Sequence, residues 1–376
     1  MALLLARHGS SELADPAAAI AELRAAIDQP GIRAVVLFCS PTYDLDGLGA
    51  VIRASFDCPV IACTSAGQIG PTGYQRGGIT GASLASEELA VQPYLVSPLS
   101  RCREGALRAA ALIRARLAVL PGHLRAFGLL LVDGLSLAEE TLTSVLYQST
   151  GDLPIFGGSA GDDLAFQRTA VYWDGKFLSD AAVFALFETS HPFATFKLAH
   201  FTPTGKRLVI TAADPAKRLV KEINGVPAAE GLAETLGIPV ECLDAAVYSR
   251  SPLMLRLGSD HYVRSISQVN PDHSLTFHCA IDEGLVLTVG ENVDPLTALE
   301  EGLRQAAQKV GAPALIVGCD CILRRLELEE RHLDERAGEL LRANKVIGFS
   351  TYGEQFNAVH VNQTLTGVVL GERCRP

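Results

Sequence analysis

The chain has 376 residues, of which 48% are hydrophobic and 20% are charged, so it is long enough for two domains and too apolar to be disordered. Its 32 Lys and Arg against 42 Asp and Glu give a net charge of −10 without a basic cluster, which disfavours nucleic acid as a partner. The apolar stretches are too short for membrane insertion, and nine scattered cysteines do not resemble a disulfide framework. We therefore expect a cytoplasmic protein.

The first part of the chain predicts a helix followed by an alternation of strands and helices. Asp15 suits the N-cap of this helix, Pro16 suits its first turn, and Pro30 stops it. The pattern then predicts a strand, a helix, a second strand that runs into Thr64-Ser65-Ala66-Gly67, and a return strand, at residues 34–38, 49–56, 60–63 and 78–84.

This order of elements occurs twice more along the chain. In the second copy the turn is Gly157-Gly158-Ser159-Ala160-Gly161-Asp162, and the strand, helix, strand and return strand are predicted at residues 128–132, 137–147, 155–156 and 182–187. In the third copy the turn is Ser350-Thr351-Tyr352-Gly353-Glu354, and the corresponding elements are predicted at residues 314–317, 332–342, 346–349 and 366–370. Three matching units predict an internal repeat.

A different stretch separates the second and third copies. It predicts a strand over Leu208–Thr211, a helix over Ala216–Ile223 and a hairpin over Tyr262–Leu287, whose turn is Asn270-Pro271-Asp272. The Pro203–Gly205 cluster interrupts the strand pattern and suggests a domain boundary. We expect an N-terminal strand and helix in residues 1–30 and two domains at 31–203 and 204–376. The predicted fold class is α/β or α+β, with mixed or antiparallel sheets.

The turn after the second strand of each copy is a candidate binding region. A strand that ends in small hydroxyl residues and glycine leaves backbone N–H groups unpaired, and glycine lets the backbone approach a ligand. We expect the three turns to converge on one or two pockets, although small residues would equally permit tight turns between packed layers. The candidate binding residues in these turns are Thr64, Ser65, Gly67, Gly158, Ser159, Gly161, Asp162, Tyr352 and Gly353.

A second group of polar residues follows the third turn. Glu354, Asn362 and Gln363 could hold the amino or carboxylate end of an amino-acid-like ligand, and Arg250 or Arg256 could bind a carboxylate. The same side chains could instead satisfy neighbouring backbone groups. The group is therefore compatible with a binder of a metal-free organic ligand.

Three stretches carry a family resemblance: "PVIACTSAGQI", "PIFGGSAGDD" and "VIGFSTYGEQ", the last followed by "HVNQTLTGVVLG". They resemble the FIST family, with its FIST N and FIST C domains, from about Arg33 to Gly371. The resemblance implies an intracellular module that senses a small ligand. Within the family, "HFTPTGKRLVIT" and "STYGEQFNAVHVNQT" are similar to bacterial nitric-oxide-sensing haem proteins (NosP), which implies a histidine kinase or a cyclic-dinucleotide enzyme as partner.

Haem would require an axial ligand in an apolar cleft, and histidine is the natural choice. His200 and His360 lie at positions that suit an exposed ligand, and His278 alternates within a strand and could point into a pocket. Each of them could instead be a packed or solvated side chain. The chain contains no CxxCH motif, which excludes covalent attachment of haem.

Enzyme motifs are present only in part. Arg7-His8-Gly9 resembles the Arg-His-Gly signature of histidine phosphatases, but the sequence that follows does not resemble that family. Gly157–Gly161 matches the nucleophile elbow, yet a strand-like stretch follows where the elbow needs a helix, so a hydrolase using Ser159 is an alternative without an activating context. Cys319 and Cys321 could bind metal or be buried structural thiols.

Together these patterns predict a FIST sensor rather than an enzyme. The favoured ligand is haem, with nitric oxide as the signal and a kinase or cyclic-dinucleotide enzyme as partner, and a homodimer is an open option. The alternatives are an amino-acid or other organic-ligand sensor without metal, and a serine hydrolase.

Overall fold

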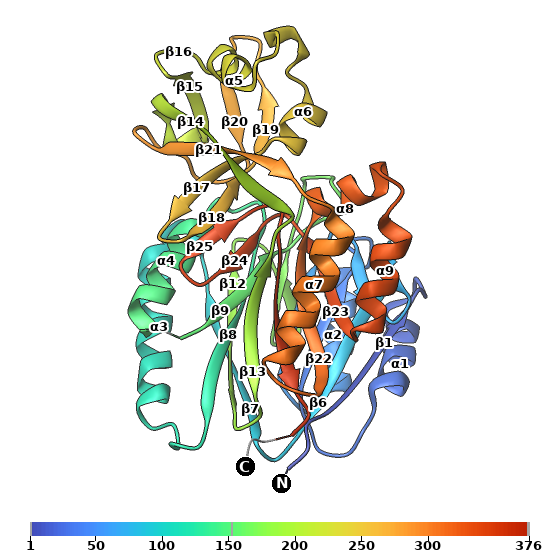
Figure 1. Cartoon of the computed structure of the whole chain (residues 1–376). Helices are drawn as coiled ribbons and strands as arrows, with labels where there is room; N and C mark the ends of the chain where they lie inside the picture. The colour runs from blue at the N-terminus through green and yellow to red at the C-terminus, as the bar shows by residue number, and fades with distance from the viewer. Residues whose placement is uncertain (1, 152, 374–376) are drawn as a thin grey trace. The chain divides into compact units, whose positions relative to one another are not determined.

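The computed structural model describes residues 2–151 and 153–373, which form two compact units (Figure 1). The larger unit comprises the residues up to Leu198, Leu299–His360 and the residues from Thr364 onward, and the smaller unit comprises Ala199–Ala298 and Val361–Gln363. Mixed and antiparallel sheets with helices confirm the predicted α+β class. The boundary expected after residue 203 falls inside strand β14 (Phe201–Asp214).

The larger unit is built from three copies of one arrangement. The first copy consists of β1 (Leu5–Ser11), α1 (Pro16–Ile27), β2 (Ile32–Cys39), α2 (Leu45–Ser55), β3 (Val60–Thr64), β4 (Gln68–Gly70), β5 (Gly73–Gln75) and β6 (Ile79–Ala85). The second consists of β7 (Leu89–Val96), a 3-10 turn (Leu99–Arg101), α3 (Cys102–Ala118), β8 (Arg125–Val132), α4 (Glu139–Thr150), β9 (Ile155–Ser159), β10 (Val171–Trp173), β11 (Lys176–Leu178) and β12 (Ala182–Thr189).

The third copy has the same order, and the smaller unit is inserted into it after its first strand. It consists of β13 (Phe193–Leu198), α7 (Pro295–Gln308), β22 (Pro313–Cys321), α8 (Ile322–Glu330), α9 (Asp334–Ala343), β23 (Val346–Thr351), β24 (Glu354–Phe356), β25 (Val359–Val361) and β26 (Leu365–Gly371).

Strand pairing is the same in all three copies. In each, a parallel pair joins the two strands that flank a helical segment, and the return strand pairs antiparallel with the first of them. The parallel pairs are β2–β3, β8–β9 and β22–β23, and the return strands are β6, β12 and β26. The predicted repeat of strand, helix, strand and return strand is therefore confirmed.

Each copy gives its short hairpin to the sheet of another copy. The β4–β5 hairpin of the first copy pairs with β23 of the third, β24 of the third copy pairs with β9 of the second, and β10 of the second pairs with β3 of the first. The exchange is cyclic. As a result, no sheet of the larger unit is complete within its own copy.

The apolar residues of the larger unit divide into an inner core and outer layers. The inner faces of the three sheets share one buried cluster, in which the Phe38 and Phe349 rings stack with centroids 4.4 Å apart. Helices α1 and α2 cover one sheet and α3 and α4 cover another on the outside (Figure 1). No helix within residues 2–151 and 153–373 is long and apolar enough to cross a membrane.

The first helix forms as its sequence predicts. The Asp15 carboxylate accepts a hydrogen bond from the Ala18 N–H at 2.9 Å, and Pro16 is the first helical residue. Ile20, Leu23 and Ile27 are buried on one face of the helix.

The smaller unit is a sheet with short helices. Its elements are β14, a 3-10 turn (Pro215–Lys217), β15 (Leu219–Ile223), β16 (Val226–Pro227), α5 (Ala228–Leu236), a 3-10 turn (Val240–Cys242), α6 (Ala245–Arg250), β17 (Leu253–Leu257), β18 (Asp260–Arg264), β19 (Ile266–Val269), β20 (Leu275–Phe277) and β21 (Val286–Asn292). The strands are ordered β18-β17-β21-β14-β15-β20-β19. The expected turn at Asn270-Pro271-Asp272 joins β19 to β20.

One prediction for this stretch is wrong. Residues Ala216–Ile223 do not form a helix: a 3-10 turn ends at Arg218, whose φ is +51°, and β15 then pairs with β14 and β20. Sheet pairing of the β-branched Val220 and Ile223 overrides the helical spacing of the apolar residues. The Pro203–Gly205 cluster lies inside β14, where the pairing with β21 shifts register between Pro203 and Arg207.

We predict that Gly348→Ala destabilises the larger unit. A Cβ atom at Gly348 would lie 1.9 Å from the Gly318 carbonyl oxygen, so the β22–β23 pair would have to shift. We expect the free energy of unfolding to fall by about 3 kcal/mol. Gly122, whose added Cβ would meet nothing within 4 Å, is the control, and Gly122→Ala should change stability by less than about 0.5 kcal/mol. Equal denaturant midpoints for the two variants would contradict this packing.

Candidate functional site

The three turns that end β3, β9 and β23 meet and bind one another through their backbones. The Ala66 N–H donates to the Ser350 carbonyl at 2.9 Å, the Gly161 N–H donates to the Thr64 carbonyl at 3.2 Å, and the Tyr352 N–H donates to the Ser159 carbonyl at 3.2 Å. The donors occupy equivalent positions in the three copies, and so do the acceptors. We call these three hydrogen bonds the turn ring.

The turn ring corrects the expectation that these N–H groups are free for a ligand. The turns do converge, as predicted, but the N–H groups of Ala66, Gly161 and Tyr352 are paired with a neighbouring copy. Thr64, Ser159 and Ser350 are each 0% exposed. The backbone polarity at these strand ends therefore joins the copies together.

The glycines of the turns permit close packing between copies. A Cβ atom at Gly161 would lie 2.6 Å from the Ala66 nitrogen, and one at Gly158 would lie 2.6 Å from the Thr351 methyl group. Gly67 has a φ of +120°, and its Cβ would lie 1.9 Å from the Arg325 guanidinium. Gly353 has a φ of +151°.

Ser65 and Thr64 satisfy nearby backbone groups. The Ser65 hydroxyl donates to the Cys39 carbonyl at 3.0 Å, and the Thr64 hydroxyl accepts from the Ala170 N–H at 3.0 Å. Their side chains are therefore engaged within the fold.

Asp162 holds the loop that follows the second turn. Its carboxylate accepts from the N–H groups of Phe166, Gln167 and Arg168 at 2.9, 2.6 and 2.8 Å, and from the Tyr352 hydroxyl. This loop is organised around one carboxylate, and the strand-like stretch that follows Gly161 in the sequence forms a strand only from Val171.

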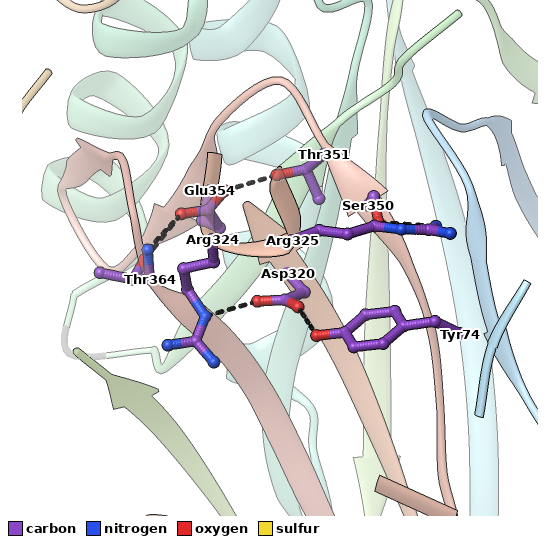
Figure 2. Close-up of polar contacts among 8 residues, drawn as sticks. All are labelled: Tyr74, Asp320, Arg324, Arg325, Ser350, Thr351, Glu354 and Thr364. Carbon is purple, nitrogen blue, oxygen red and sulfur yellow. Dashed lines mark hydrogen bonds and ion pairs between the residues drawn. The ribbon is translucent and has the colours of Figure 1, made fainter. Parts of the chain in front are cut away.

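Figure 2 shows a buried charged cluster beside the third turn. Asp320, 0% exposed, accepts from Arg324 Nε at 2.7 Å and from the Tyr74 hydroxyl. Burial, reinforced by Asp320, raises the pKa of Tyr74. Tyr74 belongs to the β4–β5 hairpin of the first copy, so the cluster ties the exchanged hairpin to the third copy's sheet.

Arg325 extends the cluster toward the turn ring (Figure 2). Its guanidinium lies 5.1 Å from the centre of the Tyr74 ring and bonds the Gln75 carbonyl at 3.0 Å, the Ser350 hydroxyl at 3.5 Å and Glu329 at 3.0 Å. The sequence interpretation considered only the two thiols beside Asp320 and missed Asp320 itself and both arginines. The pattern that could have predicted this ion pair is a carboxylate at the end of an apolar strand, four residues before an arginine.

Glu354 is a buried carboxyl group next to this cluster (Figure 2). One of its oxygens accepts from the Thr351 hydroxyl, and the other accepts from the Thr364 N–H at 3.2 Å and the Thr364 hydroxyl at 2.7 Å. Burial raises the pKa of Glu354 to about 8, although the hydroxyl hydrogen bonds oppose this shift. Near neutral pH the group therefore carries a proton that it can donate.

Gln355 contains a buried acceptor without a partner. Its Nε2 donates to the Ser159 hydroxyl at 2.9 Å and to the Gly353 carbonyl at 3.4 Å, and lies 3.4 Å from His360 Nδ1. Its Oε1 finds no hydrogen-bond partner among the residues that the structure describes, although the residue is 0% exposed. Buried polar atoms are nearly always paired, so this one requires an explanation.

Ser159 lacks the surroundings of an activated nucleophile. Within the described residues, its hydroxyl contacts Gln355 Nε2 and, at 3.5 Å, the Glu139 carboxylate. No helix follows it, as the sequence predicted. His8 of the phosphatase-like motif lies in the middle of β1 rather than at a strand end.

The cysteines behave mainly as structural residues. Cys319 and Cys321 are buried, which agrees with the structural alternative, and Cys63 is buried as well, whereas Cys58 is half-buried. In the parts of the chain that are described, no group of three or more His, Cys, Asp or Glu side chains could hold a metal ion.

Two predicted residues of the smaller unit differ in their surroundings. Arg250, at the end of α6, is exposed, and its Nε donates to the Ala246 carbonyl at 3.0 Å. Asn362 is 1% exposed, and within the described parts of the chain neither polar atom of its amide has a hydrogen-bond partner. The neighbouring Gln363 donates to the Ser249 carbonyl at 3.4 Å.

The three candidate haem ligands fit that role unequally. His200 and His360 are each 1% exposed and already have contacts, which contradicts their expected exposure. His278 is half-buried, and burial together with the charge of Arg218 lowers its pKa to about 4, which keeps the imidazole neutral. Of the three, only His278 combines partial access with the neutral state that a metal requires.

We predict a pH-dependent contribution of Glu354 to stability. Because its folded pKa is about 8 against an ordinary value of 4.5, the folded state holds the proton more tightly. The contribution is full below pH 4.5 and is lost as the pH rises through 8. Glu354→Gln should abolish this part of the pH dependence of unfolding, as measured by urea titrations between pH 5 and 9.

Glu330→Gln, at an exposed glutamate, is the matched control and should leave the pH profile unchanged. If the pH dependence of unfolding has the same shape in Glu354→Gln as in the wild type, Glu354 is ionised throughout this range and the prediction is wrong.

Comparison with known proteins identifies the family. The sequence matches the FIST N domain over residues 33–226 and the FIST C domain over residues 228–357. A search of curated proteins finds no match.

Two solved structures resemble the chain distantly. One is a cyanuric acid hydrolase, with 8% identity and a TM-score of 0.36 over 99% of this chain and 100% of that chain. The other is T. maritima PurL complexed with FGAR, with 12% identity and a TM-score of 0.22 over 99% and 73%. These scores are too low to support a conclusion about fold or function. The family matches do support one: the chain belongs to the FIST family, whose domains are generally small-ligand sensory domains of signalling proteins.

Proposed function

We propose that this FIST protein senses a small polar organic ligand of amino-acid type, held in the larger unit beside Gln355. The observation that carries the proposal is the Gln355 Oε1 atom, an acceptor that is fully buried and that no described residue pairs. A ligand ammonium or N–H group would satisfy it, and leaving it unpaired costs about 1–3 kcal/mol.

The neighbouring groups supply complementary chemistry. Protonated Glu354 can donate to a ligand carboxylate, and the Ser159 hydroxyl, already held by Gln355, can donate or accept. Hydrogen bonds to a polar ligand would be stronger at this buried position than in water, because the local dielectric constant is low. This favours the metal-free alternative over haem for this part of the larger unit.

The signal would pass to a partner enzyme. We propose a histidine kinase or a cyclic-dinucleotide enzyme, the partners that the resemblance to the nitric-oxide-sensing members implies. Ligand binding would favour one of two conformations of the chain, and the partner would respond to the change in their populations.

Haem with nitric oxide as the signal is the second candidate, and it is favoured by one observation. His278 is neutral and partly accessible, so it would be the residue that holds the iron, and haem would supply the binding of the gas. His200 and His360 are less suited because they are buried.

The test is a thermal-shift titration of the purified full chain with each standard amino acid. We expect one chemical class of amino acid to raise Tm by about 5 °C at a hundredfold excess over Kd. Gln355→Met, which keeps the size and removes the acceptor, should abolish this shift. Gln148→Met is the control, because Gln148 is exposed on α4 and bonds only Ser144 among the described residues.

Two further readouts separate the alternatives. The proposal predicts a colourless protein after expression with a haem precursor. A Soret band that shifts with nitric oxide and disappears in His278→Ala would instead support the haem candidate. Covalent labelling of Ser159 by a serine-reactive fluorophosphonate would instead indicate a hydrolase. No shift with any amino acid would overturn the proposal.

A further inference from the structure

A cavity of about 350 Å³ opens at the edge of the first copy's sheet. It lies between the C-terminal end of α2, the start of β3, strand β10 and the neighbouring strand β7. The aromatic and charged residues that line it are Arg53, Phe56, Asp57, Tyr172, Trp173 and Asp174. None of them belongs to the polar cluster beside Gln355, so this cavity is separate from the proposed sensory site.

Three aromatic side chains form much of the wall. Phe56 and Tyr172 are 6% and 4% exposed, and Trp173 is partly exposed. Tyr172 is fixed in place, because its ring packs edge-on against Phe177 at 5.5 Å and its hydroxyl oxygen accepts a hydrogen bond from the Gly175 backbone N–H. The cavity therefore presents rigid aromatic surface.

The charges at the cavity are predominantly negative. One arginine and two aspartates line it, which gives a net charge of −1. Arg53 and Asp174 neutralise each other in an ion pair at 3.1 Å, so the Asp57 carboxylate is the charge left over. Aromatic faces carry negative potential as well, and both features attract a cation.

We propose that this cavity binds a small organic cation of the quaternary ammonium class. Such a cation presents methyl groups to the aromatic faces, and its charge gains from those faces and from the nearby Asp57 carboxylate. The cavity volume lies in the range of small-molecule sites. This proposal is independent of the proposed sensory site beside Gln355 and of the ligand of that site.

The chain contains a single tryptophan, Trp173, and it lines the cavity. Intrinsic fluorescence therefore reports on this site directly. Titration of the full chain with choline should give a saturable change in Trp173 emission. The neutral isostere, in which carbon replaces the ammonium nitrogen, should bind at least about tenfold more weakly because it lacks the charge.

Two variants test the parts of the cavity, with binding measured by both fluorescence and calorimetry. Asp57→Asn should weaken choline binding about threefold, as expected for an exposed charge. Phe56→Leu, a conservative change, should weaken it about fivefold by removing one aromatic face. Asp28→Asn, at an exposed aspartate outside the cavity, is the control and should bind choline like the wild type.

Three results would overturn the proposal: no saturable change with choline, equal affinity for choline and its neutral isostere, or Asp57→Asn and Phe56→Leu that bind choline like Asp28→Asn. Circular dichroism of each variant establishes that it is folded. If Phe56→Leu fails to fold, the comparison of choline with its isostere on the wild-type chain decides the question alone.

Discussion

The larger unit depends on the turn ring, in which each of three copies donates one backbone hydrogen bond to the next. The Ala66, Gly161 and Tyr352 N–H groups would otherwise be orphaned at buried strand ends, where an unpaired donor costs about 1–3 kcal/mol. Within its own copy each of these N–H groups has no acceptor, and a carbonyl group of a neighbouring copy accepts its hydrogen bond. The cyclic exchange of hairpins repeats the same dependence at the level of strands. The three copies must therefore fold as one body.

The buried charges beside the ring follow from this arrangement. Once the β4–β5 hairpin is carried to the third copy's sheet, Tyr74 lies against Asp320, and Arg324 neutralises that carboxylate at 2.7 Å. An ion pair that is 2% and 0% exposed contributes little net stability, because desolvation offsets its attraction. Its effect is to fix one orientation of the hairpin. The unpaired Gln355 acceptor nearby is different, since the fold itself gives no reason for it.

Much of the larger unit could be predicted from sequence because its signals are local. Asp15 and Pro16 mark the first helix, and apolar runs that end in Ser, Thr and Gly mark the second strand of each copy. The exchange of hairpins could not be predicted, since each copy's pattern is also compatible with pairing within the copy. The helix expected at 216–223 failed because its apolar spacing suits both a helix and a paired strand.

The candidate site was predicted in position but not in chemistry. The turns converge as expected, yet their N–H groups serve one another, and Tyr74 and Asp320 meet across 246 positions of the chain. No pattern within a single copy indicates such a contact. Glu354 was singled out as a polar residue of the third copy's loop, but its burial and its raised pKa depend on residues from elsewhere in the chain.

Amide hydrogen exchange at Ala66, Gly161 and Tyr352 tests the central claim most directly. If the turn ring holds the three copies together, these three amides exchange only through global unfolding, and their protection equals the free energy of unfolding measured with denaturant. Exchange at the rates of exposed loop amides would contradict the turn ring and would mean that these N–H groups are free to bind a ligand.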